Sequence, residues 1–335
     1  MKPPTRRQFL IENLPGALAA GAVGAAILTE PRLRAAAAGE IPRRPFGKTG
    51  VRVSILGLGG WHIGIQKDPA ESHRLIRTAM DAGINFLDNS NDYNEGQSEI
   101  RMGEAIKGRR DQVFVMTKFN FRDKKNALRE LETSLRRLQT DYVDLWQFHS
   151  IERQEDPDWI FAPHGAIEAA ELAKKQGKAR FIGFTGHKSP DYHLKMLTKP
   201  YAWDAIQMPL NVLDPHFGSF ERRVLPEAVK RQLGIVGMKP MAFQNAPKTG
   251  VITSTECLHY AMSLPVSVTL TGCETMERLE TALAAARTFR QLSEAEMEAL
   301  RERMKPFVKD GANEPYKITK DFDNRPAGFP PPYEA

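Results

Sequence analysis

Four ionisable side chains stand at or near the ends of short apolar runs. Asp88, Lys118 and His149 each end such a run, and Tyr93 lies five residues after Asp88. A free tyrosine has a pKa of about 10, which makes it a poor acid at neutral pH. A lysine ammonium nearby lowers that pKa, a carboxylate keeps the ammonium charged and in place, and an imidazole can hydrogen-bond to the same oxygen atom. If these four side chains meet, they can therefore transfer a proton to or from an oxygen atom.

The elements that must position them alternate along the chain. Short apolar runs typical of buried parallel strands occur at Ile55–Leu58, Asn85–Leu87, Val113–Thr117, Val143–Phe148, Ala179–Phe184, Ala205–Met208, Ile235–Met238 and Val266–Leu270. Segments with helical periodicity lie between them, at Glu71–Asp81, Glu99–Lys107, Ala127–Leu138, Ile167–Lys175, Glu221–Gln232 and Met276–Phe289. This alternation predicts an α/β fold, a (β/α)₈ TIM barrel, in preference to a doubly wound open sheet, because no composition shift marks a second domain. The active site of such a barrel lies at the carboxyl ends of its strands, where the four side chains stand.

Turn and capping residues refine this prediction. Glycines in a left-handed conformation are expected to end four of the helices, at Gly83, Gly108, Gly177 and Gly234. A hairpin over Pro45–Val53 is predicted to cap the floor of the barrel. An extra C-terminal helix is predicted over Ser293–Met304, with Ser293 as N-cap and Glu296 completing a capping box. The chain from Gly311 is rich in proline and aromatic residues and is expected to be extended.

At these residues the chain resembles the aldo-keto reductase family. The matching segments are Gly83–Asp88 with Asp92 and Tyr93, Thr117 with Lys118, Asp144–His149, Leu56–Trp61 and the floor hairpin. The resemblance runs from about Pro45 to Arg287, and it implies a barrel that binds a nicotinamide cofactor and reduces aldehydes or ketones, or catalyses the reverse reaction. It also implies that Tyr93 is the proton donor and that Lys118 and Asp88 are its electrostatic partners. His149 would orient the carbonyl group.

The resemblance further implies a set of cofactor-binding residues on the later strands. They are Thr185, Gln207, Met238, Lys239, Gly272 and Arg278. Thr185 keeps a hydroxyl where the family usually shows Ser-Asn, and Met238 stands where the family often stacks an aromatic ring on the nicotinamide. Arg278 is retained without the lysine that usually precedes it, and arginine can clamp a 2′-phosphate, so NADP is expected rather than NAD, with NAD as the alternative.

Aromatic and imidazole side chains of the first loop are candidates for substrate contact. Trp61 and His62, with Tyr93, are predicted to line the mouth of the barrel. Phe119 and Trp159 are further candidates, although lone aromatic side chains more often pack than bind. The expected partner is a small-molecule carbonyl compound.

Several other interpretations compete with this one. Asp88 could cap a following helix or form a structural ion pair with Lys118, and His149 could be a satisfied core histidine. The run Gly57–Gly60 lacks the GxGxxG spacing of a Rossmann turn. The eight histidines include no HxH or HExxH motif, which disfavours a metal-dependent barrel hydrolase, and no metal is predicted. A non-enzymatic, nicotinamide-bound redox-sensing or binding subunit stays open as the alternative to an enzyme.

The first 38 residues have the three parts of a secretory signal peptide. Arg6 and Arg7 precede a charge-free run, Gly16–Leu28, and an alanine tract, Ala35–Ala38. The adjacent arginines resemble a twin-arginine signal, and the run is too short to span a membrane. We therefore expect a cleaved signal peptide at 1–38, a barrel at 39–310 and a tail at 311–335. The twin-arginine machinery would export the protein to the periplasm without a stable membrane anchor; an inefficient signal would leave it in the cytoplasm.

Composition excludes other classes of protein. The chain has 335 residues, of which 41% are hydrophobic and 26% charged, as in a soluble globular protein. Its two cysteines, Cys257 and Cys273, are too few for a disulfide scaffold or a zinc ribbon. Residues 1–38 carry five of the basic and two of the acidic side chains, so their removal would lower the net charge from +6 to about +3. Such a charge does not indicate nucleic-acid binding.

Overall fold

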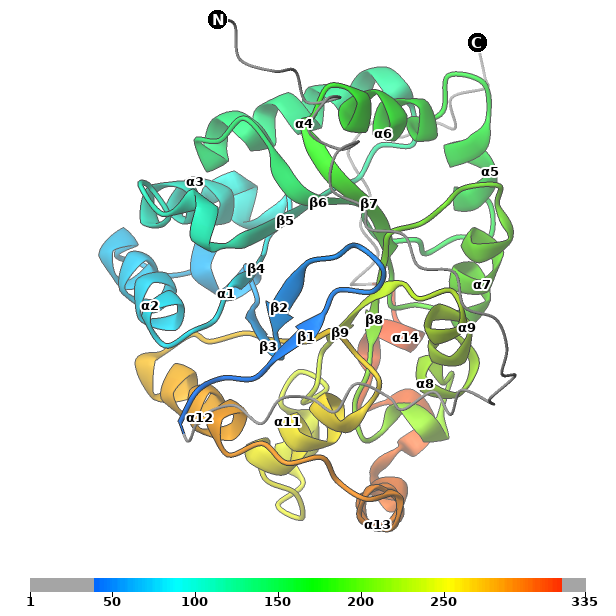
Figure 1. Cartoon of the computed structure of the whole chain (residues 1–335). Coiled ribbons are helices and arrows are strands. Elements are labelled where there is room, and N and C mark those ends of the chain that lie inside the picture. Colours follow the sequence, from blue (N-terminus) through cyan, green and yellow to red (C-terminus); the bar gives the residue numbers. More distant parts are fainter. Residues whose placement is uncertain (1–38, 321–335) are drawn as a thin grey trace, which may run out of the picture. The chain divides into compact units, whose positions relative to one another are not determined.

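Eight parallel strands close into a barrel in the computed structural model, which describes residues 39–320 (Figure 1). The strands are β3 (Leu56–Leu58), β4 (Phe86–Asp88), β5 (Phe114–Phe119), β6 (Val143–Phe148), β7 (Ala179–Thr185), β8 (Ala205–Pro209), β9 (Gly234–Met238) and β10 (Val268–Thr271). They follow one another around the barrel, and β10 pairs with β3 to close it. The predicted TIM barrel is confirmed. The predicted signal peptide (1–38) and residues 321–335 of the tail lie outside the described residues.

Burial on both faces explains why these strands are apolar runs. Every residue of β5 and β6 is buried, because one face of each strand points into the barrel and the other packs against helices. The floor of the barrel is filled by aromatic rings: Phe46 lies 4.9 Å from Phe114 and 5.8 Å from Phe86 between ring centroids. The interior is therefore a packed core below the mouth at the carboxyl ends of the strands.

The predicted floor hairpin is present, and it supplies Phe46. Its strands are β1 (Arg43–Pro45) and β2 (Arg52–Ser54), which pair antiparallel and lie across the near end of the barrel in Figure 1. Buried Arg44 donates hydrogen bonds to the carbonyls of Met262 (2.7 Å) and Val266 (2.9 Å). The hairpin is thus tied to the barrel by both apolar and polar contacts.

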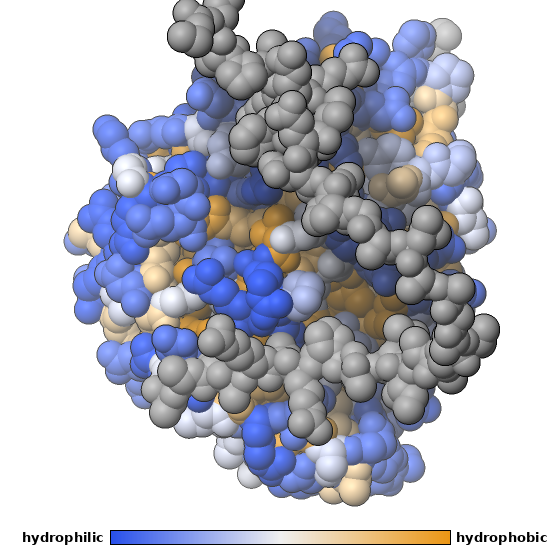
Figure 2. Space-filling model, in the orientation of Figure 1, coloured by the Kyte–Doolittle hydropathy of each residue, from blue (hydrophilic) through white to orange (hydrophobic). Residues whose placement is uncertain are grey.

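Helices cover the outside of the barrel. They are α1 (Trp61–Gly64), α2 (Pro69–Asp81), α3 (Gln97–Ala105), α4 (Lys124–Leu138), α5 (Asp156–Phe161), α6 (Ala166–Lys175), α7 (Pro190–Thr198), α8 (Phe220–Arg223), α9 (Leu225–Lys230), α10 (Asn245–Lys248), α11 (Ser254–Ser263), α12 (Met276–Arg287), α13 (Glu294–Met304) and α14 (Pro315–Ile318). Their outer faces are mostly hydrophilic, with hydrophobic residues between them (Figure 2). The capping box of Ser293 and Glu296 at α13 is confirmed. The single helix predicted over Glu221–Gln232 is wrong: Pro226 has no N–H to donate, and the segment divides into α8 and α9.

Three of the four predicted glycine caps adopt the left-handed conformation, with φ of 104° at Gly83, 76° at Gly108 and 73° at Gly177. Gly234 does not. Gln232 takes the left-handed conformation there (φ 55°), and Gly234 lies within β9. A Cβ atom at Gly234 would lie 2.6 Å from the Phe46 ring, so the glycine is explained by close packing on the floor.

The described part of the tail is packed, not extended. Residues Pro315–Ile318 form α14, and Tyr316 and Lys317 are buried. Lys317 Nζ donates to Asp214 Oδ1 (2.7 Å) and to Glu314 Oε2 (2.8 Å), which fixes α14 against the loop after β8. The expectation of an extended tail is therefore wrong for these residues.

Candidate active site

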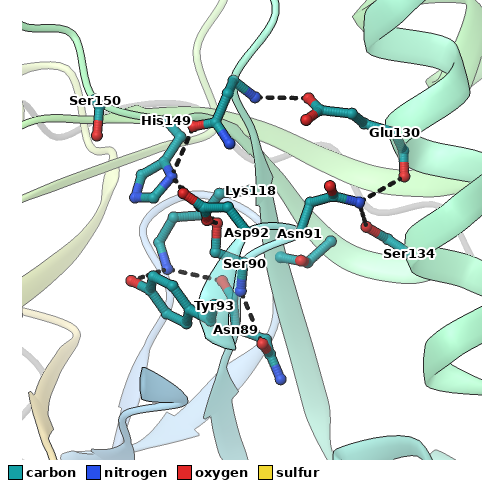
Figure 3. A network of polar contacts seen from close by, with 12 residues as sticks. Asn89, Ser90, Asn91, Asp92, Tyr93, Lys118, Glu130, Ser134, His149 and Ser150 are labelled. Atoms are coloured by element: carbon teal, nitrogen blue, oxygen red, sulfur yellow. Dashed lines mark hydrogen bonds and ion pairs between the residues drawn. The ribbon is translucent and has the colours of Figure 1, made fainter. Parts of the chain in front are cut away.

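Lys118 is the centre of the polar network at the mouth of the barrel (Figure 3). Its Nζ donates to Asp88 Oδ1 (2.5 Å), the backbone oxygen of Asn89 (2.7 Å) and Tyr93 Oη (3.0 Å). An ammonium group has three hydrogens, so these three acceptors use all of them. Tyr93 therefore accepts from Lys118 and keeps its own hydroxyl proton to donate elsewhere.

Neighbouring strands bring these groups together. Asp88 ends β4, and Lys118 lies near the end of β5, which pairs with β4 in parallel. Tyr93 begins a short 3₁₀ turn after β4, in which Asn94 and Glu95 take left-handed conformations (φ 52° and 58°). Such conformations are costly for residues other than glycine and are typical of functional loops, and here they form the turn that carries the phenol.

Burial raises the pKa of the Tyr93 phenol well above 10, and the carboxylates of Asp88 and Asp92 act in the same direction. This is opposite to the lowering expected from Lys118. The main reason is burial, which disfavours the phenolate, and the Asp88 carboxylate, 2.5 Å from the Lys118 ammonium, adds to it by opposing the effect of the ammonium on the phenol. The protein thus presents Tyr93 as a protonated phenol, which can act as an acid but not as a preformed phenolate.

His149 lies beside Tyr93, with its Nδ1 atom in a group of acceptors. The ring centroids of the two residues are 5.8 Å apart. Nδ1 lies 3.0 Å from Asn120 Oδ1, 3.1 Å from Ser90 Oγ and 3.5 Å from Asp92 Oδ1. Ser90 donates its own proton to Asp92 Oδ1 (2.5 Å), so Nδ1 must carry a hydrogen toward these oxygens.

Burial lowers the pKa of His149, and the nearby Asp92 carboxylate only partly opposes this. The imidazole is therefore neutral at pH 7, with its proton on Nδ1. Sequence reasoning missed Ser90 and Asn120 and gave Asp92 no role. A usable signal was their position, because Ser90 and Asp92 share the loop of Tyr93, and Asn120 comes two residues after Lys118.

A second layer of contacts supports the loop after β5. Glu130 on α4 accepts hydrogen bonds from the backbone N–H groups of Asn120 (2.7 Å) and Phe121 (3.3 Å). Burial raises the pKa of the Glu130 carboxyl to about 7. Asn91 donates to the Glu130 backbone oxygen (3.2 Å) and to Ser134 Oγ (3.1 Å), so α4 holds the loops after both β4 and β5 (Figure 3).

Comparison with known proteins identifies the fold and its family. The sequence model described as "Aldo/keto reductase family" matches residues 55–252, more than half of the chain. The chain belongs to the aldo/keto reductase family. This is a family of NAD(P)-dependent oxidoreductases.

Two curated relatives and one solved structure show how far the similarity extends. The chain is 34% identical to "Aldo-keto reductase YhdN" of Bacillus subtilis (strain 168) over 200 residues, which is 54% of this chain and 56% of YhdN, less than two thirds of that relative. It is 27% identical over 313 residues to "Uncharacterized oxidoreductase YqkF" of the same organism, covering 78% of this chain and 96% of YqkF. The holo form of the aldo-keto reductase AKR11C1 from Bacillus halodurans has the same fold, with a TM-score of 0.66, 22% identity, and coverage of 79% of this chain and 96% of that one.

In the aldo/keto reductase barrel the predicted cofactor residues lie on the later strands or in the segments that follow them. Buried Thr185 ends β7. Gln207 on β8 accepts a hydrogen bond at Oε1 from Gln147 Nε2 (2.9 Å), and its own Nε2 lies 3.5 Å from Met238 Sδ. The Gln207 amide is thus engaged by protein groups, and a carboxamide ligand would have to share its hydrogen bonds.

The turn after β10 places Gly272 against His62. A Cβ atom at Gly272 would lie 1.9 Å from His62 Nδ1, so only glycine admits the imidazole there. His62 Nε2 lies 3.3 Å from Glu274 Oε1, and burial lowers the pKa of His62. Glu274 also holds Arg278 at 3.0 Å, through its other oxygen. Arg278 is 46% exposed and lies in the first turn of α12.

The aromatic candidates fall in different environments. Trp61 is 50% exposed, and its ring meets that of Tyr93 edge-on at 5.5 Å, which places it at the mouth. Phe119 is fully buried and stacks on Trp146 at 4.0 Å, so it is a core residue and its prediction as a substrate contact is wrong. Trp159 lies on α5 beneath the Arg153 guanidinium.

The predicted cofactor residue Lys239 lies directly after β9. Its Nζ atom lies over the rings of Phe243 (4.3 Å) and Tyr316 (5.0 Å).

Residues 39–320 contain neither a three-ligand cluster for a metal ion nor a membrane-spanning helix. No group of three or more His, Cys, Asp or Glu side chains in this range is arranged to hold a metal ion. None of the helices in the same range has the length and apolar character needed to cross a membrane.

Proposed function

We propose that this protein transfers hydride between a nicotinamide cofactor and a small carbonyl compound or its alcohol, with Tyr93 as the proton donor. The observation that carries this proposal is the saturation of Lys118. Because Asp88, Asn89 and Tyr93 accept all three ammonium hydrogens, the Tyr93 hydroxyl is left with its proton directed away from Lys118. A fixed phenol of this kind is what the oxygen of a reduced carbonyl requires.

The residues at the ends of β7–β10 suit such a cofactor. Thr185 and Gln207 supply a hydroxyl and an amide for a carboxamide group, and Arg278 supplies a guanidinium for a 2′-phosphate. Met238 and Lys239 after β9, and Gly272 after β10, complete the set. The bound nicotinamide would supply or accept the hydride. We favour NADP over NAD because Arg278 stands at the start of α12.

The chain's own residues would control the proton. In reduction, Tyr93 donates its proton to the substrate oxygen as negative charge develops there, and Lys118 stabilises the resulting phenolate. Asp88 keeps the ammonium in place at 2.5 Å. His149, neutral with its proton on Nδ1, has an Nε2 atom that can only accept a hydrogen bond, so it can hold the hydroxyl group of the alcohol but cannot donate to the carbonyl oxygen.

The test is turnover of the Tyr93→Phe variant. Removing one hydroxyl group should lower kcat by about 10²- to 10⁴-fold, the usual contribution of general acid catalysis, while the Kd for NADPH, from fluorescence titration, changes less than about twofold. Tyr142→Phe is a matched control, because Tyr142 lies outside the mouth and its ring contact with Arg110 does not need the hydroxyl. Normal turnover by Tyr93→Phe would refute the assignment. NADPH binding by the wild type without NADPH oxidation over a broad aldehyde panel would instead favour a redox-sensing or binding subunit.

We also propose that the protein is exported by the twin-arginine machinery and matures by cleavage near Ala38. The support is the sequence alone: paired arginines, a weakly hydrophobic run and an alanine tract. N-terminal sequencing of the protein from fractionated cells tests this. A cytoplasmic protein that starts at Met1 would refute it.

A further inference from the structure

Glu130 links α4 to the start of the loop after β5. Its Oε2 atom accepts hydrogen bonds from the backbone N–H groups of Asn120 (2.7 Å) and Phe121 (3.3 Å), which directly follow the strand. Lys118 lies near the end of the same strand, two residues before Asn120. One carboxylate oxygen therefore fixes the direction in which the chain leaves the strand that carries Lys118.

The side chain of Asn120 connects this carboxylate to His149. Asn120 Oδ1 lies 3.0 Å from His149 Nδ1 and is one of the oxygens toward which the imidazole proton points. The backbone oxygen of Asn120 accepts from Arg122 Nη1 (2.9 Å), and Arg122 Nη2 donates to the backbone oxygen of His149 (2.7 Å). Asn120 is therefore held at its N–H by Glu130 and at its carbonyl by Arg122, and these two contacts determine where its side-chain oxygen lies.

Glu130 also contacts the loop after β4, which reaches His149 from another strand. Asn91 Nδ2 donates to the backbone oxygen of Glu130 at 3.2 Å (Figure 3). The neighbours of Asn91 in the sequence, Ser90 and Asp92, place oxygens 3.1 Å and 3.5 Å from His149 Nδ1. Glu130 is thus joined to both loops that supply oxygens to the imidazole.

The Glu130 carboxyl changes its charge near neutral pH. Burial raises its pKa to about 7, and Asp92 acts in the same direction, while the two backbone N–H groups and Arg122 oppose the shift. A carboxylate accepts stronger hydrogen bonds than a neutral carboxyl group, so the hold on the two N–H groups weakens as the pH falls below 7. His149 takes up its own proton at a lower pH, because burial lowers its pKa.

We propose that Glu130 is a positioning residue, which holds Asn120 so that the His149 proton stays on Nδ1 and Nε2 stays the acceptor for the substrate hydroxyl. Glu130 acts on the imidazole through Asn120 and the loop after β5, and it forms or breaks no bond in the reaction. The inference rests on the proposed function, but the position of the imidazole proton can be measured without turnover.

The kinetic experiment measures kcat/KM between pH 6 and pH 8.5 with NADPH and 4-nitrobenzaldehyde, an aldehyde that does not titrate in this range. Glu130→Ala removes the acceptor and should lower kcat/KM at pH 8 about 10- to 100-fold, the effect of a displaced active-site group, with the Kd for NADPH within about twofold. Glu130→Gln keeps an acceptor of the same shape and should stay within about threefold of the wild type at pH 8. In the wild type kcat/KM should fall about threefold or more as the pH falls through about 7, and Glu130→Gln should lack this decline. The matched control is Glu132→Gln, which changes a carboxylate of the same helix that pairs with Lys178, and it should follow the wild type at every pH.

NMR of the full chain with ¹⁵N-labelled histidine rings measures the imidazole directly, and a loss of stability alone does not change this result. The His149 signals are assigned by their absence from the spectrum of His149→Gln. In the wild type at pH 8 the proton should be on Nδ1, and the signals should shift with a midpoint at the Glu130 pKa of about 7. The Nε2–H tautomer should appear in Glu130→Ala, and the shift should be absent in Glu130→Gln.

Two results would overturn the proposal. One is a Glu130→Gln protein whose kcat/KM declines with falling pH as the wild type does. The other is a His149 tautomer and a pH response that are the same in the wild type and in both Glu130 variants. If the wild type does not reduce the aldehyde, the proposed function is in question, and the NMR comparison alone decides whether Glu130 positions His149. If Glu130→Ala does not fold, the pH responses of Glu130→Gln decide it.

Discussion

The two halves of the barrel mouth differ in how completely their polar groups are paired. On the side of β4–β6, Lys118 has three acceptors within 3.0 Å, and His149 Nδ1 lies among three oxygens. On the side of β7–β10, Lys239 contacts aromatic rings, and half-exposed Arg278 pairs with Glu274. The first side is organised before any ligand binds, as transition-state stabilisation requires. The second side has cationic side chains with which a bound ligand can still form ion pairs. Substitutions on the first side should therefore reduce stability and turnover, and those on the second should reduce affinity.

The largest expected effect comes from breaking the pairing on the first side. Lys118→Met leaves the buried Asp88 carboxylate without its partner, which should cost about 3–5 kcal/mol of unfolding free energy. The double variant Asp88→Asn/Lys118→Met removes both charges and should recover much of that loss. Arg278→Met, on the exposed pair, should cost less than about 1 kcal/mol.

Urea unfolding of the three variants measures this contrast. A Lys118→Met protein as stable as Arg278→Met would show that the two sides do not differ in the way described.

The same contrast explains how much the sequence could reveal. Strands buried on both faces are predicted from apolar runs, and all the predicted strand ends lie within two residues of the observed ones. Asp88, Lys118 and His149 could be predicted as neighbours because each stands near the carboxyl end of a strand, where the geometry of a barrel brings side chains together.

Contacts between distant segments could not be predicted. Ser90 meets His149 from 59 residues away, and His187 lies against the backbone of Tyr316 across 129 residues. The sign of the Tyr93 pKa shift also depends on burial by the whole mouth, which composition and spacing do not report. The sequence thus predicts which strand ends hold polar groups, and it leaves open which of those groups are already paired.

A smaller effect concerns a buried histidine that supports the second side. His193 on α7 lies with Nε2 3.1 Å from the backbone oxygen of Gln207, and burial lowers its pKa from 6.5 to about 4. Between pH 6.5 and about 4, His193 is protonated in the unfolded chain but stays neutral in the folded protein. The stability contribution is therefore present above pH 6.5 and is lost as the pH falls toward 4.

The expected loss is about 1.4 kcal/mol per pH unit and about 3 kcal/mol in total. Urea unfolding between pH 7 and pH 4.5 should show a shallower decline for His193→Gln than for the wild type. If the unfolding free energies of the two proteins decline in parallel with falling pH, other groups cause the acid sensitivity. His149 and His187 are then the candidates, because burial lowers the pKa of both.

The smallest effect is expected where the mouth is most exposed. Arg278 must exchange its contact with Glu274 for a 2′-phosphate, so part of the new interaction only replaces the old one. Arg278→Ala should raise the Kd for NADPH about 2- to 5-fold, the range expected for a partly solvated ion pair, and should leave the Kd for NADH unchanged within error. Fluorescence titration with both cofactors measures this, and Arg290→Ala, in an exposed pair with Glu296, is the control. Equal changes for NADPH and NADH would mean that Arg278 does not contact the 2′-phosphate. The preference for NADP would then lack its structural basis, while the pairing around Lys118, on the opposite side of the mouth, would be unaffected.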